Sequence, residues 1–349
     1  MLSNSAAPIP STRIAILNML PLLPAYGIEP SIVFDPVRPS ETPDLTAVID
    51  DIVNANLDVV VLQKVRGASA ETLVARLRER GIKTVFLVCD LVDPSMAEKT
   101  DASVVVTDFL RSLYPAQLQH KISVVHDGIE QAAMVARREN KGRGSRSHPL
   151  KAVLVTSAHL INLPVLSDLP SWLHVTIVGR YEHGVREKMR RARWDFASTD
   201  GIEAKLRLAR FLMNRQIRCI PWDPVGVYTE MCNSDIGIIP IDTPEVAANP
   251  NVQPSWKVKS ENRLTMKMSL GLPVVATPIP SYEPVISQGV NGFLARDVGA
   301  WATMLEALRD PALRSRMGDA AREHALQNYS QERQALRLAA VFRALFEEK

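Results

Sequence analysis

The chain has 349 residues, of which 46% are hydrophobic and 23% charged, a composition typical of a soluble globular protein with room for two ordinary domains. Its net charge of +3 is too small to indicate nucleic-acid binding. The cysteines Cys89, Cys219 and Cys232 are widely spaced, which argues against a disulfide framework or a zinc site and fits a reducing cytosol.

The first residues of the chain, 1–11, are polar and contain proline, without the basic and apolar regions of a signal peptide. No apolar run approaches the roughly 20 residues needed to span a bilayer. We therefore expect a cytoplasmic protein.

In the first half of the chain, short runs of Val, Ile and Leu alternate with amphipathic segments. This alternation predicts buried parallel strands connected by helices, the βαβα arrangement of an open α/β sheet. The predicted strands are 14–17, 31–34, 58–62, 83–88, 103–106 and 122–125. The predicted helices are 45–54, 70–80 and 108–114.

A small, polar and basic segment, 139–149, separates the two halves, and it reads either as an interdomain linker or as a long surface loop. We take it as a linker between a domain of residues 1–147 and a domain of residues 148–330. The alternation then restarts, with predicted strands 152–156, 174–178, 217–220, 235–239 and 273–276. Predicted helices are 185–194, 202–214, 225–233, 261–270 and a final 330–349, which carries Leu338, Val341, Phe342 and Leu345 on one stripe.

The helix 261–270 has the pattern of an anion-binding element. Ser260 is a suitable N-cap, and Gly271 ends the helix. Lys259, Arg263 and Lys267 recur every four residues, so they fall on one side of the helix near its N-terminus, where the dipole already favours anions. This side of the helix is either a binding site for a diphosphate or a solvated basic face.

The residues of this region also carry a family resemblance. Residues 260–264 (Ser-Glu-Asn-Arg-Leu), 271–277 (Gly-Leu-Pro-Val-Val-Ala-Thr), 283–286 (Glu-Pro-Val-Ile) and 289–294 resemble the donor half of GT-B glycosyltransferases of the family-four type. The resemblance covers the second half of the chain well and the first half loosely. It implies two Rossmann-like domains facing a cleft, with the C-terminal helix crossing back to the first domain.

The same resemblance implies a reaction and a partner. The donor would be a nucleoside-diphosphate sugar, held without a metal or other cofactor, and transfer to a hydroxyl acceptor would retain the anomeric configuration. The acceptor would be a glycan or a lipid-linked sugar of surface polysaccharide synthesis. Consistent with this expectation, the chain lacks the glycine-rich loops of dinucleotide oxidoreductases and P-loop kinases and has no metal-ligand motif.

Candidate site residues follow from matching positions. Asp90 ends a strand, where its carboxylate could orient or deprotonate an acceptor, whereas Asp93 reads better as a helix N-cap. Lys259 and Arg263 are the candidates for stabilising the leaving diphosphate. The donor-binding candidates are Gly179, Arg180, Trp222, Ser260, Glu261, Asn262 and Lys267. For Arg180 the alternative is a surface arginine, and for Trp222 a buried core tryptophan. The loop 242–254 is the candidate for sugar recognition.

Two departures from the family pattern stand out. The two glutamates that many family-four enzymes carry eight positions apart are replaced by Val258 and Met266. The segment 157–164 lacks the usual basic residues. Either Lys259, Arg263 and Arg180 take over phosphate neutralisation, or the donor site is altered; Glu261 is a candidate replacement for one glutamate.

These departures keep two other functions open, a GT-B-fold sugar-nucleotide epimerase and a non-catalytic GT-B-like subunit that supports a partner enzyme. A dense run of basic residues around Met189 and Trp194 also has two interpretations. It is either a solvated helix face or a contact surface for a lipid-linked acceptor, an anionic polymer or a membrane. The basic residues of this run are Arg186, Lys188, Arg190, Arg191 and Arg193.

Overall fold

The computed structural model describes residues 1–130, 143–156, 163–181, 184–244 and 253–347. The chain forms two compact units. The first unit comprises residues 1–130, 250–262 and 327–349, and the second comprises residues 131–249 and 263–326. The functional domains drawn from the sequence, 1–147 with the final helix and 148–330, remain predictions. Among the described residues, no helix is both long and apolar enough to cross a lipid bilayer.

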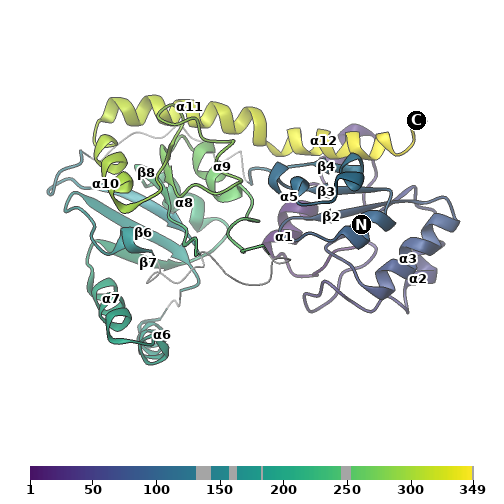
Figure 1. Cartoon of the computed structure of the whole chain (residues 1–349), viewed down its shortest axis with the longest axis horizontal. Helices are drawn as coiled ribbons and strands as arrows, with labels where there is room; N and C mark the ends of the chain where they lie inside the picture. The colour runs from purple at the N-terminus through teal and green to yellow at the C-terminus, as the bar shows by residue number, and fades with distance from the viewer. Residues whose placement is uncertain (131–142, 157–162, 182–183, 245–252, 348–349) are drawn as a thin grey trace. The chain divides into compact units, whose positions relative to one another are not determined.

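The first unit is built on a parallel sheet in the order β1-β2-β3-β4 (Figure 1). Its strands are β1 (Val59–Gln63), β2 (Lys83–Val88), β3 (Ala102–Val105) and β4 (Ile122–Val124). Leu2 forms parallel bridges with both Leu62 of β1 and Phe34, so the N-terminal segment extends the sheet beyond β1. Its helices are α1 (Pro10–Thr12), α2 (Ile49–Val53), α3 (Ala68–Glu79), α4 (Pro94–Lys99), α5 (Asp108–Ser112) and α12 (Gln331–Ala344).

Side chains of the first sheet alternate between two hydrophobic cores. In β2, Phe86 and Val88 pack with helices α3 to α5, whereas Val85 and Leu87 pack with the other core, which includes α12. This alternation is the two-residue period of a strand, and it explains the nearly continuous apolar runs of the sequence. A final helix is confirmed as α12, which contributes Leu338 to the second of these cores, but it ends at Ala344 and not at Lys349 as predicted.

Two predicted strands of the first unit are wrong. Residues 14–17 lie in a π-helix, Arg13–Leu17, which follows α1. Residues 31–34 make only an isolated bridge at Phe34. A short apolar run does not distinguish a buried strand from a buried helical turn, and Pro10 at the first position of α1 favours the helix.

The second unit contains a parallel sheet in the order β10-β9-β8-β5-β6-β7. Its strands are β5 (Leu150–Val155), β6 (Leu173–Gly179), β7 (Ile217–Pro221), β8 (Ile236–Ile239), β9 (Val274–Ala276) and β10 (Phe293–Leu294). Strand order reverses between β5 and β8, and ligands of open α/β sheets bind beyond the carboxyl ends of the strands at such a reversal. Thr156 follows β5 there, and Pro240 follows β8.

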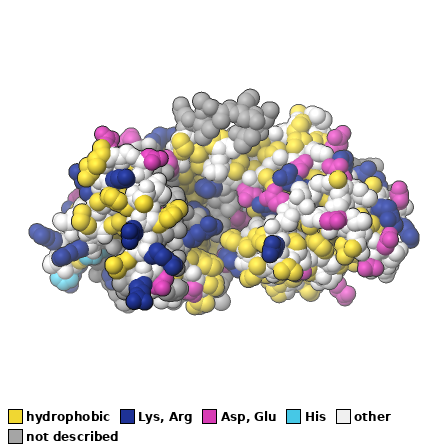
Figure 2. Space-filling view, turned by 90° about the horizontal axis from the view of Figure 1, so that it is seen from below, with side chains coloured by type: hydrophobic (Ala, Val, Ile, Leu, Met, Phe, Trp, Pro, Cys, Tyr) yellow, Lys and Arg dark blue, Asp and Glu magenta, His cyan; other side chains and the backbone are white. Residues whose placement is uncertain are grey.

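Helices cover both faces of the second sheet. They are α6 (Val185–Ser198), α7 (Ile202–Met213), α8 (Gly226–Cys232), α9 (Asn262–Ser269), α10 (Val298–Ala307) and α11 (Pro311–Tyr329). The α/β class with two parallel sheets is therefore confirmed. Figure 1 shows α6 and α7 side by side below β6 and β7, and Figure 2 views the protein from that side, where hydrophobic and basic side chains are interspersed.

Candidate functional site

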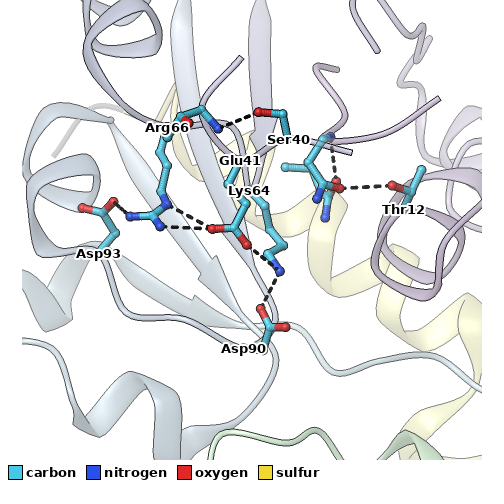
Figure 3. A network of polar contacts seen from close by, with 10 residues as sticks. Thr12, Ser40, Glu41, Lys64, Arg66, Asp90 and Asp93 are labelled. Carbon is cyan, nitrogen blue, oxygen red and sulfur yellow. Dashed lines mark hydrogen bonds and ion pairs between the residues drawn. The ribbon is translucent and has the colours of Figure 1, made fainter. Parts of the chain in front are cut away.

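The carboxyl end of β1 carries a buried cation. Lys64 follows the strand directly and adopts a left-handed backbone conformation with φ of 56°, which is uncommon for a residue other than glycine. Its Nζ lies 2.7 Å from Oδ1 of Asp90 and 3.0 Å from Oε1 of Glu41 (Figure 3). Burial alone would lower the pKa of Lys64, but the hydrogen bonds and negative charge of its partners raise it. Lys64 therefore stays charged.

This ion pair holds in place the side chain of Asp90, the first catalytic candidate. Asp90 comes two residues after β2, and its side chain is 53% exposed although it pairs with the buried lysine. One face of the carboxylate is thus held by the protein while the group remains accessible to solvent. This position suits the predicted role of orienting an acceptor hydroxyl, which remains a prediction.

Arg66 extends the same network along the edge of the sheet. Its Nη2 lies 3.1 Å from Oε2 of Glu41 and its Nη1 3.5 Å from Oδ2 of Asp93 (Figure 3). Oδ1 of Asp93 accepts a hydrogen bond from the backbone N–H of Met96, so Asp93 caps α4. The N-cap interpretation of Asp93 is thus confirmed.

A buried amide lies beside this network. Gln63, the last residue of β1, is fully buried, and its Oε1 accepts a hydrogen bond from the backbone N–H of Asn4. Its Nε2 has no hydrogen-bond partner among the described residues. Because a buried donor is costly to leave unsatisfied, this amide is a natural contact for a buried water molecule.

A second group of titratable side chains follows β4. The Nδ1 atom of His126 lies 3.0 Å from the carbonyl oxygen of Val106 and 3.3 Å from Oε1 of Glu261, whose side chain is 2% exposed. Burial lowers the pKa of His126, whereas the hydrogen bond and the negative charge of Glu261 raise it. The net shift of the pKa is upward. The ring of Tyr329 packs edge-on against the imidazole, with 5.0 Å between centroids.

Asp127 belongs to the second group, and Cys89 links it to the first. Burial and the neighbouring charge of Glu261 raise the pKa of Asp127 to about 7, against an opposing hydrogen bond from Ser260. The negative charges of Asp90 and Asp127 both contribute to a raised pKa of Cys89, after burial as the main cause. The carboxyl ends of β2 and β4 thus bring carboxylates together at one edge of the first sheet.

The equivalent edge of the second sheet carries Gly179, Arg180 and Trp222. A Cβ atom on Gly179 would come within 2.3 Å of the carbonyl oxygen of Thr156, so the neighbouring strand itself requires glycine here. The carbonyl of Gly179 accepts a hydrogen bond from the N–H of Trp222 at 2.8 Å. Trp222 is 40% exposed, which excludes the interpretation of a buried core tryptophan, and Arg180 is exposed.

The start of α9 differs from its prediction. The helix begins at Asn262, so Glu261 precedes it directly and Ser260 lies one residue too early to be its N-cap. The Ser260 hydroxyl instead hydrogen-bonds the carboxyl group of Asp127. Arg263 occupies the first turn and is half-buried, as is Lys259.

Lys267 does not lie on a solvated basic face. Its side chain is fully buried, and Nζ donates a hydrogen bond to the backbone carbonyl of Arg263 at 3.0 Å. A Cβ on Gly237 of β8 would lie 2.8 Å from Cδ of Lys267, so the glycine makes room for the lysine stem. Burial, and then the positive charge of Arg263, lower the pKa of Lys267 to about 7.

The positions of the two replaced glutamates are both in hydrophobic cores. Val258 packs into the core of the first unit that contains α3, and Met266 packs with Val153 and Val155 of β5 in the second unit. No carboxylate is therefore supplied by either position. The candidate replacement, Glu261, is buried next to His126.

Some predictions fall outside the described residues. Residues 245–252 make up most of the predicted sugar-recognition loop, and residues 157–162 most of the segment without basic residues. Among the residues that the structure describes, no group of three or more His, Cys, Asp or Glu side chains could hold a metal ion.

Several residues of the candidate site escaped the sequence analysis, namely Gln63, Lys64, Glu41, His126 and Tyr329. A polar residue directly after a buried strand was an available signal for Gln63 and Lys64. The contacts of Lys64 with Glu41 and of His126 with Tyr329 could not be predicted, because these partners are distant in the sequence.

The two units together define the GT-B class of fold, which the chain shares with solved glycosyltransferase structures over nearly its whole length. HepE from Anabaena, in complex with UDP and glucose, matches with a TM-score of 0.65 and 12% identity, covering 98% of each chain. A glycosyltransferase from Rickettsia africae matches with a TM-score of 0.68 and 13% identity, covering 99% of this chain and 97% of the other.

Sucrose-phosphate synthase from Thermosynechococcus elongatus matches with a TM-score of 0.54 and 13% identity, covering 86% of this chain and 79% of the other. No family model and no curated protein sequence matches the chain. At these identities the likeness establishes the predicted fold alone.

Proposed function

We propose that this protein transfers the sugar of a nucleoside-diphosphate sugar to a hydroxyl acceptor. The observation that carries the proposal is the GT-B fold itself, shared along 97% or more of both chains with HepE and with the glycosyltransferase from Rickettsia africae. HepE has been crystallised with UDP and with UDP-glucose. UDP-glucose is therefore the first donor to test.

The donor would bind at the carboxyl edge of the second sheet. There, the exposed ring of Trp222 offers a stacking surface for the base. The guanidinium of Arg263, in the first turn of α9, suits a diphosphate because it can form two parallel hydrogen bonds to phosphate oxygens at a helix N-terminus. Arg180 and Lys259 are further cations proposed from the sequence, as are Ser260, Glu261 and Asn262 for contacts with the nucleotide sugar.

The acceptor would bind at the carboxyl edge of the first sheet. The accessible carboxylate of Asp90 is a hydrogen-bonding group suited to sugar hydroxyls. Lys64 holds Asp90 in place through its ion pair at 2.7 Å. A glycan or a lipid-linked sugar of a surface-polysaccharide pathway remains the proposed acceptor class.

In the proposed reaction, the bond between the anomeric carbon and the diphosphate oxygen breaks, and its electron pair leaves with the diphosphate. The acceptor oxygen forms the new bond to the anomeric carbon and passes its proton to a base, for which Asp90 is the proposed group. Arg263 stabilises the negative charge that develops on the leaving diphosphate, a contribution that is commonly the largest in such sites. We propose that the reaction retains the anomeric configuration and uses no metal ion.

A thermal-shift panel of UDP-, GDP-, TDP- and ADP-sugars tests donor binding, because a ligand that binds only the native state raises the melting temperature. We expect one nucleotide class to raise it and the others to leave it unchanged. Incubation of that donor with glycan acceptors should then give a transfer product. If none of the four classes shifts the melting temperature, the proposed function is wrong.

Changing Trp222 to Ala should weaken donor binding by about tenfold, since stacking of a base on an aromatic ring contributes about 1–3 kcal/mol. Calorimetric titration with the nucleoside diphosphate alone measures this effect. Trp222→Phe should restore most of the affinity, whereas equal affinity of all three proteins would remove Trp222 from the site.

Changing Asp90 to Asn should raise the KM for the acceptor by about tenfold with a smaller change in donor affinity, because a hydrogen bond to a charged group contributes about 1.5–3 kcal/mol. Steady-state kinetics with each substrate varied in turn gives the two values. A loss confined to donor affinity would place Asp90 away from the acceptor.

Two observations favour a second candidate function. Val258 and Met266 are apolar and buried where many related enzymes carry glutamates, which is compatible with a non-catalytic subunit. A chain that binds no nucleotide by calorimetry would support that alternative.

An epimerase would instead convert the sugar nucleotide in the absence of any acceptor, so product analysis separates it from a transferase.

A further inference from the structure

Helix α6 exposes an unusual combination of side chains. Three large hydrophobic and three arginine side chains are exposed on a helix that belongs to a well-packed α/β unit. The exposed residues are Met189, Trp194, Phe196, Arg186, Arg190 and Arg193. At about 100° per residue they fall on one continuous side of the helix, with Trp194 58% exposed. A helix that only covers the sheet would keep such residues on its inner side.

Helix α7 is hydrophobic on two opposite sides. Leu208 is buried, and Phe211 packs against the core of the second unit. Ile202, Leu206 and Met213 lie on the other side, and Ile202 and Met213 are 71% and 73% exposed. The inner stripe therefore accounts for the attachment of α7 to the sheet. The outer stripe is exposed to solvent.

The two helices form one surface. They are consecutive in the chain and lie side by side (Figure 1). The Nζ atom of Lys205 on α7 lies 5.8 Å from the centre of the Phe196 ring on α6, within the range of a cation–π contact. In Figure 2 the hydrophobic side chains of this part of the second unit alternate with basic ones rather than forming a purely apolar patch.

The chain segment that carries this surface is more basic than the rest of the chain. Residues 185–215 contain nine Lys and Arg against four Asp and Glu, a net charge of +5, whereas the whole chain carries +3. All other residues together are thus net acidic. Exposed apolar side chains surrounded by cations match a surface that offers both negative charge and an apolar interior, such as a bilayer with anionic lipids.

We propose that α6 and α7 form a membrane-docking surface that binds anionic lipid bilayers. Trp194, Ile202 and Met213 insert at the level of the headgroups, and the neighbouring arginines contact lipid phosphates. A second copy of the chain is a poorer occupant, because residues 185–215 have a net charge of +5 and two copies of this segment would repel each other. The proposal does not depend on which sugar nucleotide the protein uses.

Flotation of the full chain with lipid vesicles tests the proposal. We expect binding to vesicles of phosphatidylcholine mixed with phosphatidylglycerol and much weaker binding to phosphatidylcholine alone. Two triple variants should each bind the anionic vesicles on the order of 100-fold more weakly: Trp194→Gln, Ile202→Gln, Met213→Gln and Arg190→Gln, Arg193→Gln, Arg210→Gln. Arg210 is an exposed residue in the last turn of α7. The matched controls Val290→Gln and Arg316→Gln change exposed residues elsewhere in the second unit and should bind like the wild type.

Three outcomes would overturn the proposal. The wild-type chain could stay unbound with both kinds of vesicle, either triple variant could bind anionic vesicles as well as the wild type, or binding could be equal with and without anionic lipid. Sedimentation of the protein without lipid tests whether a second copy binds this surface instead. If the wild type forms a dimer and the variant Trp194→Gln, Ile202→Gln, Met213→Gln does not, the surface is a dimer interface. Circular dichroism and melting temperatures of the variants distinguish loss of binding from loss of fold.

Discussion

Replacing Arg263 with Ala should reduce donor turnover about a hundredfold. The guanidinium lies in the first turn of α9, where we propose that it stabilises the charge developing on the leaving diphosphate. Loss of one such contact typically costs 10²–10³ in rate. The backbone carbonyl of Arg263, which accepts the hydrogen bond from Lys267, is unaffected by the substitution. The fold should therefore survive.

Kinetics of Arg263→Ala, Arg263→Lys and the control Arg316→Ala measure this effect. The lysine variant keeps the charge but loses bidentate geometry, so it should fall between the other two. The control changes an exposed arginine on α11 and should behave as the wild type. Unchanged kinetics in Arg263→Ala would exclude α9 from the mechanism.

The second large effect concerns stability and pH. Lys267 is fully buried and its pKa is lowered to about 7 in the folded protein, whereas in the unfolded chain a lysine has an ordinary pKa near 10.4. Between these values the unfolded state binds more protons, so stability rises with pH. The rise should be ~1.4 kcal/mol per pH unit. Below pH 7 the lysine is charged in both states, and the full cost of burying its charge is present.

Changing Lys267 to Met should remove this cost. Met fits the same elongated space beside Gly237, so the variant should be more stable than the wild type at pH 6 by a few kcal/mol. The advantage should shrink as the pH rises from 7 to 9. Denaturant unfolding at several pH values, with Lys205→Met as the control on α7, measures the difference. A pH-independent difference would show that the buried amine does not titrate in this range.

Strands of the sheets were predictable because buried parallel strands are continuous apolar runs of limited length. The strand predicted at 83–88 coincides with β2, Lys83–Val88. The same rule failed at 14–17, since Ile14 and Ile16 are buried equally well by a helical turn. Apolar pattern alone thus locates buried segments better than it assigns their backbone conformation.

The candidate site was less predictable than the fold. The sequence placed Asp90 at a strand end, but the ion pair with Lys64 depends on the register of two neighbouring strands. Spacing of four residues placed Lys267 with Lys259 and Arg263 on one helix side, whereas the structure buries it under β8. Gly237 inside a predicted strand was the available signal, because such a glycine often marks a close approach by another group.

The first unit is assembled from three separate stretches of chain, and this has a consequence for biosynthesis. Ala335, Leu338 and Phe342 of α12 fill one of its cores, and Val258 belongs to the other. A fragment of residues 1–147 would leave both cores incomplete and exposed. During translation, the residues needed to close the first unit leave the ribosome only after every residue of the second. The N-terminal portion of the nascent chain therefore cannot complete its cores until the second unit has been synthesised.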